Sequence, residues 1–164
     1  MVGSLNETLE SEKKVIIYTD GACSGNPGKG GYGIVMFYGE KKSEFSDGFL
    51  NTTNNRMELL AVIDALEKLK RPCNVKLYSD SKYVIDSITK GWVYSWAKKG
   101  WKKSDGKMAL NIDLWERVLP LLKIHTVEFV WVKGHANNEF NERCDFLARN
   151  HILNGVLKND ENFL

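Results

Sequence analysis

Four acidic residues stand in distinctive local contexts in this 164-residue chain. They are Asp20 in YTDGACSGNPG, Glu58 in TTNNRMELLA, Asp80 in LYSDSKYV and Asp145 in NERCDFLAR. Carboxylates are hard oxygen ligands that suit Mg²⁺ and Mn²⁺, and a buried group of them is electrostatically costly unless cations compensate its charge. Two such cations about 3.5–4 Å apart are a common arrangement for phosphodiester hydrolysis. If these four side chains meet in space, the pattern predicts a metal-dependent nuclease.

Each of the first three carboxylates also has a simpler structural explanation when it is taken alone. Asp20 precedes a glycine-rich turn and could hydrogen-bond to its own backbone. Glu58 lies three residues after Asn55, at the N3 position of a capping arrangement. Asp80 follows a predicted strand and opens a predicted helix, so it could be an N-cap.

Asp145 lies inside a predicted helix, where it could simply pair with Arg143 or Arg149. The joint pattern is more informative than any single residue. The first and third acids both end predicted inner strands, and in open α/β sheets ligand sites gather at the carboxyl ends of strands. The glutamate lies in the first turn of its helix, where the positive end of the helix dipole favours an acid. A capping position and a metal site are therefore compatible.

Hydrophobic periodicity predicts the elements that must hold these acids. Five strands rich in β-branched and aromatic residues are expected at 15–20, 32–38, 43–50, 74–79 and 126–132. Four helices are expected at 55–70, 81–89, 112–122 and 140–152, with Asn54 or Asn55 capping the first and Pro120 ending or kinking the third. The first three strands have short connections and should be antiparallel, whereas later strands alternate with helices and should pair in parallel. The expected fold is a three-layer α/β domain with a mixed five-stranded sheet flanked by helices.

The composition indicates one folded domain, with 43% hydrophobic residues. We expect a polar N-terminal tail at 1–14, a domain at 15–153 and a C-terminal tail at 154–164, which looks loose. No apolar run approaches the roughly 18 residues of a membrane span, and the N-terminus has no secretory segment. The three cysteines are far apart and give neither a disulfide framework nor zinc spacing. We therefore expect a cytoplasmic protein without a membrane partner.

The segment from Lys90 to Lys107 carries six lysines against one acid, although the net charge of the whole chain is only +2. Trp92, Trp96 and Trp101 are interleaved with these lysines. Such a segment could follow phosphates and offer aromatic faces to sugars or bases. It could equally be an amphipathic element with tryptophans in the core and lysines in water.

Seven motifs in this order resemble the type 1 ribonuclease H family in its bacterial single-domain form. They are TDGACSGNPGKGGYG, NNRMEL, SDS-K-YV, W-x-x-x-W-x-K-K-G-W, NIDLW, VKGHA and NERCDFLAR, and they span about Val15 to Arg149. The resemblance implies a ribonuclease H-like fold and endonucleolytic hydrolysis of the RNA strand of RNA/DNA hybrids, which leaves 5′-phosphate and 3′-hydroxyl ends. It also implies two Mg²⁺ ions per active site during turnover, for which Mn²⁺ can substitute.

The resemblance assigns roles to the four acids and to His135. Asp20 should bridge two ions, Asp145 should help to hold the ion that activates the attacking water, and Glu58 and Asp80 should help to hold the ion at the leaving 3′-oxygen. His135, in the motif VKGHA, should transfer a proton or help the product to leave, as suits a group that titrates near neutrality. A nearby assisting role for Glu142 is a weaker expectation.

The resemblance also implies substrate contacts. Minor-groove contacts to bases or backbone are expected from Asn26, Asn54 and Asn55, and a pocket for a DNA phosphate from Thr53, Arg56 and Asn111. The lysine and tryptophan segment matches a basic protrusion that grips the DNA strand, with contacts expected from Trp92, Lys98, Lys99, Lys102 and Lys103. Trp96 and Trp101 are expected to belong mainly to the core.

The chain departs from the family pattern at a few positions. Lys82 stands where many bacterial relatives have glutamine, and we count it as a substrate contact. Gly91 is an additional residue before Trp92. We expect a monomer, and the resemblance implies an RNA/DNA hybrid as its partner. Two other functions compete: a non-catalytic hybrid- or RNA-binding module, which loss of a carboxylate would favour, and a DNA-acting nuclease or strand-transfer enzyme, which usually carries additional DNA-binding domains.

Overall fold

Five strands form the middle layer of the protein: β1 (Val15–Gly25), β2 (Gly28–Tyr38), β3 (Lys41–Thr52), β4 (Asn74–Ser79) and β5 (Thr126–Trp131). The structure is a computed structural model and describes residues 14–134 and 138–163. The strand order is β3-β2-β1-β4-β5. The first three strands are antiparallel, and β4 is parallel to both β1 and β5. The predicted mixed sheet is therefore confirmed.

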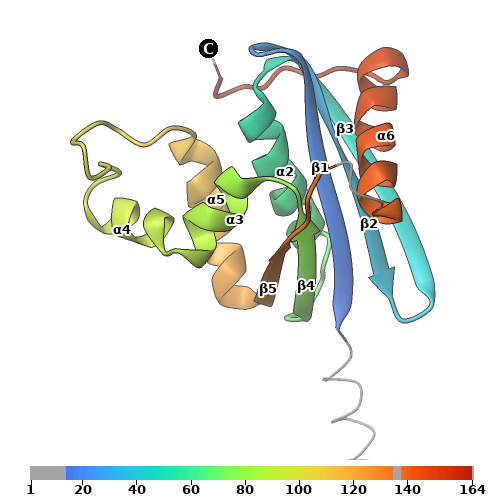
Figure 1. The fold of residues 1–164 in the computed structure, drawn as a ribbon, viewed down its shortest axis with the longest axis horizontal. Helices are drawn as coiled ribbons and strands as arrows, with labels where there is room; N and C mark the ends of the chain where they lie inside the picture. The colour runs from blue at the N-terminus through green and yellow to red at the C-terminus, as the bar shows by residue number, and fades with distance from the viewer. Residues whose placement is uncertain (1–13, 135–137, 164) are drawn as a thin grey trace, which may run out of the picture.

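Helices cover both faces of this sheet. They are α2 (Asn54–Glu67), α3 (Lys82–Thr89), α4 (Trp92–Lys98), α5 (Ile112–Ile124) and α6 (Glu139–Asn154). Helix α6 packs on β1, β2 and β3, while α2 packs on the opposite face of β1 and β2 and is backed by α5. Figure 1 shows these three layers, with α4 and the following loop projecting away from the sheet. Within the described ranges, no helix is both long and apolar enough to cross a membrane.

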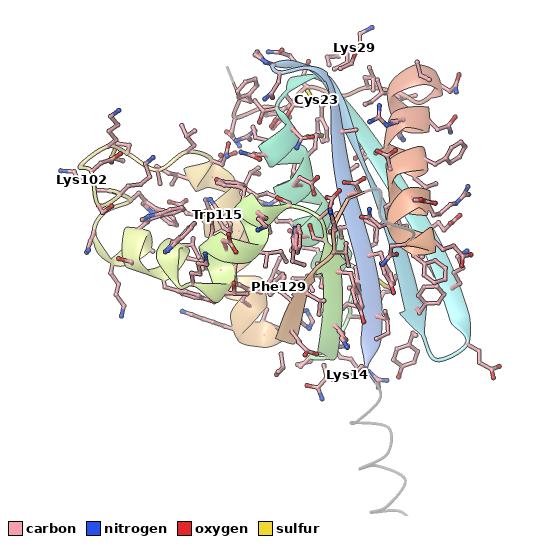
Figure 2. The ribbon with its side chains drawn as sticks, in the orientation of Figure 1. Lys14, Cys23, Lys29, Lys102, Trp115 and Phe129 are labelled. Carbon is pink, nitrogen blue, oxygen red and sulfur yellow. The ribbon has the colours of Figure 1, made fainter. Side chains whose placement is uncertain are left out.

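The main core lies between the sheet and the layer of α2, α3 and α5. On β1 the alternate residues Val15 and Ile17 are buried, as the period of two along a strand requires. Helix α2 is buried over most of its circumference because the sheet and α5 enclose it. Trp115 of α5, which Figure 2 labels, is fully buried. Its ring meets those of Tyr83 and Trp96 edge-on. These ring contacts attach α4 to the body of the protein.

Several elements extend further than the sequence predicted. Strand β1 continues to Gly25 and β2 begins at Gly28, so the segment expected to be a glycine-rich turn is mostly a hairpin of paired strands. Glycine is needed in this segment because α6 lies so close to the sheet that a Cβ atom at Gly31 would lie 2.8 Å from the Ala148 carbonyl oxygen. Helix α5 runs through Pro120 to Ile124, two residues past its predicted end.

The C-terminal segment is attached to the domain and is not loose between residues 156 and 163. The Leu50 amide donates to the Lys158 carbonyl oxygen at 2.8 Å, and the Lys158 amide donates to the Gly48 oxygen at 3.0 Å. Asp160 then reaches Arg56 on α2, with Oδ2 2.7 Å from Nε. Helix α6 ends at Asn154, one residue beyond the predicted domain boundary.

Candidate active site

Three carboxylates from separate parts of the chain meet where the parallel pairing of β1 with β4 ends, at Thr19 and Ser79. Asp20 lies within β1 and not at its end as expected, Glu58 belongs to α2, and Asp80 directly follows β4. One oxygen atom from each lies within 4.8 Å of the other two. Asp20 and Glu58 are 4% and 3% exposed, so their charges are largely removed from water. The predicted convergence is confirmed for these three acids.

Gly21 determines how closely Asp20 and Glu58 approach. Its amide donates to Asp20 Oδ1 and to Glu58 Oε1, each at 3.0 Å. A Cβ atom at this position would lie 2.7 Å from the Glu58 amide nitrogen, so a side chain would push α2 away from β1. Glycine therefore allows one backbone N–H group to orient two of the acids.

The capping roles that competed with a metal site belong to other residues. Thr53 is the N-cap of α2 and accepts from the Arg56 amide at 3.2 Å, so the expected cap at Asn54 or Asn55 is wrong and Glu58 lies beyond the N3 position. Ser81 is the N-cap of α3 and accepts from the Val84 amide at 3.2 Å. Asp80 is therefore not the cap of α3.

Burial and mutual repulsion raise the pKa values of the two inner acids. Burial is the larger cause for Asp20, and the charges of Glu58 and Asp80 raise its pKa further. Burial followed by the charge of Asp80 raises the pKa of Glu58, and the Gly21 amide opposes that shift only in part. Among the described residues, Glu58 Oε2 is buried without a hydrogen-bond partner. Hard oxygen donors, excess negative charge and an unsatisfied buried oxygen together fit a divalent metal ion.

Asp145 faces the same cavity but is turned toward an arginine. The cavity of about 400 Å³ is lined by all four acids. Cys144 is fully buried and its Sγ contacts the Tyr18 carbonyl oxygen, which fixes this turn of α6 against β1. Both carboxylate oxygens of Asp145 accept from Arg149 Nε at 3.0 Å. Asp145 is not in the group of ligand atoms within 4.8 Å, although its charge contributes to the raised pKa of Glu58.

Two other residues were expected to take part in catalysis, His135 and, more weakly, Glu142. His135 falls in residues 135–137, outside the described ranges. The preceding Gly134 packs on Asp80, since a Cβ atom there would lie 3.0 Å from Asp80 Oδ2. Glu142 is exposed in the first turn of α6.

Several predicted substrate contacts lie at the rim of the cavity. Asn54, Asn55 and Lys82 contribute to its lining. Asn26 lies beside them, and its Oδ1 accepts from the Asn54 amide at 3.1 Å. The Lys82 ammonium lies 4.7 Å from the ring centre of Trp131, whose Nε1 donates to the Asp80 carbonyl oxygen at 3.1 Å. Trp131, which the sequence did not single out, thus holds a cation at the mouth of the site.

Arg56 occupies a different position from the one expected of a phosphate ligand. It is 3% exposed, and its three guanidinium nitrogens donate to Asp113, Asp160 and the Oδ1 atom of Asn111. Two carboxylates therefore already satisfy its charge, and its role is to join α2, α5 and the C-terminal segment. Asn111 is held from its other side by Tyr83, whose hydroxyl accepts from Nδ2 at 3.1 Å. Arg56 thus orients a predicted substrate residue and is not itself free to bind phosphate.

The lysine and tryptophan segment forms the projection around α4. Trp92 is 44% exposed, whereas Trp96 and Trp101 are partly buried and pack against the core. A hollow of about 280 Å³ is lined by Trp92 and by lysines that include Lys99, Lys102 and Lys103. Figure 2 shows Lys102 at the outer end of the projection, far from Trp115. Trp96 and Trp101 therefore pack in the core as expected, while contact of Trp92 and the lysines with nucleic acid stays a prediction.

The sequence model of the ribonuclease H family matches residues 12–152. The chain belongs to the ribonuclease H family. A relative named ribonuclease H from Syntrophus aciditrophicus is 54% identical over 154 residues, which cover 94% of this chain and 89% of that protein. This membership confirms the expected family, whose members are metal-dependent nucleases. The acid cluster is a group of side chains that could hold a metal ion.

Solved ribonuclease H structures share the fold. LC9-RNase H1, described as a type 1 enzyme with the type 2 active-site motif, has a TM-score of 0.78 and 32% identity, with 88% of this chain and 74% of that chain covered. LC11-RNase H1 in complex with an RNA/DNA hybrid has a TM-score of 0.60 and 25% identity, covering 83% and 94% of the two chains.

Proposed function

We propose that this protein is an endoribonuclease that hydrolyses the RNA strand of RNA/DNA hybrids and leaves 5′-phosphate and 3′-hydroxyl ends. The observation that carries the proposal is the meeting of Asp20, Glu58 and Asp80 within 4.8 Å, just beyond the point where β1 and β4 cease to pair. Membership of the ribonuclease H family supports the reaction, and the hybrid bound to LC11-RNase H1 supports the substrate class.

The four carboxylates would hold two Mg²⁺ ions, with Mn²⁺ as a substitute. Asp20 is central to the cluster and would be shared, Glu58 and Asp80 would complete one position, and Asp145 would complete the other. The chemistry supplied by bound ions is activation of the attacking water and neutralisation of charge at the leaving 3′-oxygen. Burial strengthens the preference of these oxygens for cations, because the acids otherwise repel one another in a poorly solvated site.

The protein groups around the acids orient the substrate. Asn26, Asn54 and Asn55 form a rim of amides beside the cluster, suited to hydrogen bonds with minor-groove edges and 2′-hydroxyls. Thr53 and Asn111 are proposed to contact a DNA phosphate, with Asn111 held in place by Arg56 and Tyr83. His135 is proposed to move a proton or assist product departure.

The projection is proposed to grip the DNA strand away from the cleavage point. Its exposed Trp92 offers an aromatic face, and four lysines supply charge: Lys98, Lys99, Lys102 and Lys103. Lys82, at the mouth of the site, is proposed to contact the backbone near the scissile bond. We further propose a monomer in the cytoplasm, where the free thiols of Cys23, Cys73 and Cys144 would stay reduced.

A cleavage panel tests the proposal. The protein is incubated with end-labelled RNA/DNA hybrid, duplex RNA, duplex DNA and single-stranded RNA, each in Mg²⁺ and in EDTA. We expect cleavage of the hybrid RNA strand in Mg²⁺ alone, and none by Asp20→Asn. Cleavage in EDTA, or equal cutting of single-stranded RNA, would contradict the proposal. Binding of hybrid without turnover in Mg²⁺ would instead indicate a non-catalytic module.

A further inference from the structure

Arg149 is a cation placed directly on a carboxylate of the catalytic cavity. Its Nε donates to both oxygens of Asp145 at 3.0 Å. It also lines the cavity that contains the other three acids. Asp145 is 24% exposed and Arg149 63% exposed at their side chains, so the pair lies at the cavity wall in contact with solvent.

The pair is local and needs no ligand to form. Asp145 and Arg149 are four residues apart on α6, with the acid on the N-terminal side, which is the favourable order for an ion pair on a helix. Helix α6 is held to the sheet by the buried Cys144 beside Asp145. Arg149 therefore stays within reach of Asp145 whenever the domain is folded.

The pairing coincides with a difference among the four acids. Asp20, Glu58 and Asp80 each present an oxygen within 4.8 Å of the other two, whereas Asp145, the acid with an arginine partner, is not in this group. Glu58 Oε2, by contrast, is buried without a partner in the described structure. Three of the four acids therefore lie close together, whereas the charge of the fourth, Asp145, is already compensated by Arg149.

We propose that Arg149 is a positioning residue that competes with divalent metal ions for Asp145. In the metal-free protein it turns the Asp145 carboxylate aside and reduces the repulsion within the cavity. A metal ion that binds Asp145 must then break its ion pair with Arg149, and this cost weakens metal binding by the free protein. This inference rests on the proposed function in that Asp145 is taken as a metal ligand.

The released guanidinium would still face the region where nucleic acid is expected. Arg149 also lines a second hollow of about 220 Å³, with Cys23, Ser24 and Ile152 among its other lining residues. The two hollows share Ala22, Cys23 and Arg149, so the side chain lies at the boundary between them. A modest movement away from Asp145 therefore keeps the cation beside the cavity and does not expel it from the site.

Titration of the metal-free protein with Mn²⁺ by isothermal calorimetry tests this competition without nucleic acid or turnover. We expect Arg149→Gln to bind Mn²⁺ about twofold more tightly, since an i,i+4 ion pair on a helix contributes about 0.3–0.5 kcal/mol. Arg143→Gln is the matched control, because Arg143 lies on the same helix and pairs with Glu44, which is not in the cavity lining. Its affinity for Mn²⁺ should stay at the wild-type value.

A second pair of variants separates competition for Asp145 from a general effect of charge. In an Asp145→Asn background, Arg149→Gln should leave the Mn²⁺ affinity unchanged, because the competed ligand is gone. Unchanged or weaker binding by Arg149→Gln alone would overturn the inference, and so would equal tightening in the Asp145→Asn background. Circular dichroism verifies that each variant is folded. Failure of the wild-type protein to bind any Mn²⁺ would overturn both this inference and the proposed function, whereas Mn²⁺ binding without hybrid cleavage would contradict the proposed function alone.

Discussion

Replacing Asp20 by asparagine should stabilise the metal-free protein while abolishing cleavage. Asp20 is 4% exposed and shares its surroundings with Glu58 and Asp80, so folding brings like charges together in a poorly solvated place. Burial and these neighbours raise the pKa of Asp20, and burial with Asp80 raises that of Glu58. Asparagine keeps the size and the oxygen that accepts from Gly21, and it removes one charge.

The magnitude follows from the separation of the acids. Two unit charges 4.8 Å apart repel by about 3.5 kcal/mol at an effective dielectric constant near 20. Partial protonation relieves part of this repulsion, so we expect a gain of about 2–3 kcal/mol at pH 8. For a protein of this size that corresponds to a rise in Tm of about 4–12 °C.

The dependence on pH has a definite sign. A carboxyl group whose pKa is raised in the folded state binds more protons folded than unfolded, so its contribution to stability is complete below its unfolded pKa and is lost as pH rises toward the folded value. Asp20 and Glu58 should therefore increasingly destabilise the metal-free wild type as pH rises from about 4. The Asp20→Asn variant should lose less stability as pH rises, so the difference in Tm between the two proteins should be smaller at pH 5 than at pH 8.

Thermal unfolding followed by circular dichroism in EDTA at pH 5 and pH 8 measures these changes. Asp86→Asn is the control, because it removes the same charge from α3, where Asp86 pairs with Lys90 at 3.7 Å. That variant should change the free energy of unfolding by less than about 1 kcal/mol. A Tm of Asp20→Asn at pH 8 that is equal to or below the wild-type value would refute the electrostatic reasoning.

Two further predictions concern the C-terminal segment and the projection. Asp160→Ala should lower the free energy of unfolding by about 2–3 kcal/mol, less than the 3–5 kcal/mol for a fully orphaned buried charge, because Arg56 keeps Asp113. Urea unfolding measures this against the exposed neighbour control Glu161→Gln, and equal stability of the two variants would show that the segment is not held by this pair. Replacing the four lysines of the projection by glutamine should flatten the salt dependence of hybrid binding measured in Ca²⁺ by fluorescence anisotropy, by about 0.9 in slope for each lost phosphate contact. The four lysines are Lys98, Lys99, Lys102 and Lys103. An unchanged slope of affinity against salt concentration would show that these lysines do not contact the hybrid.

The sheet and the acid cluster were predictable because their signals are local. A run of β-branched and aromatic residues marked β1, and short or helical connections determined which strands pair antiparallel or parallel. Asp20 and Asp80 could be placed together because each directly follows the stretch in which β1 and β4 pair in parallel, which ends at Thr19 and Ser79. That β1 continues past Asp20 to Gly25 was not predicted. The side-chain chemistry then led to a metal site without knowledge of the distances.

Other features depend on partners far away in the sequence. Arg56 is surrounded by Asp113 and Asp160, 57 and 104 positions away, so its burial could not be inferred from its neighbours. The C-terminal segment has no periodicity, yet single contacts such as Lys158 to β3 attach it. The caps were misassigned because several residues able to cap stand side by side, and only the backbone geometry distinguishes Thr53 from the asparagines that follow it.

Anomalous diffraction from crystals of the wild-type protein soaked in Mn²⁺ would show whether the three clustered carboxylates bind metal. We expect a Mn²⁺ peak coordinated by Asp20 together with Glu58 and Asp80, and loss of that peak in Asp20→Asn. Saturating Mn²⁺ that leaves no peak between these carboxylates, in a protein that still cleaves the hybrid, would contradict this expectation.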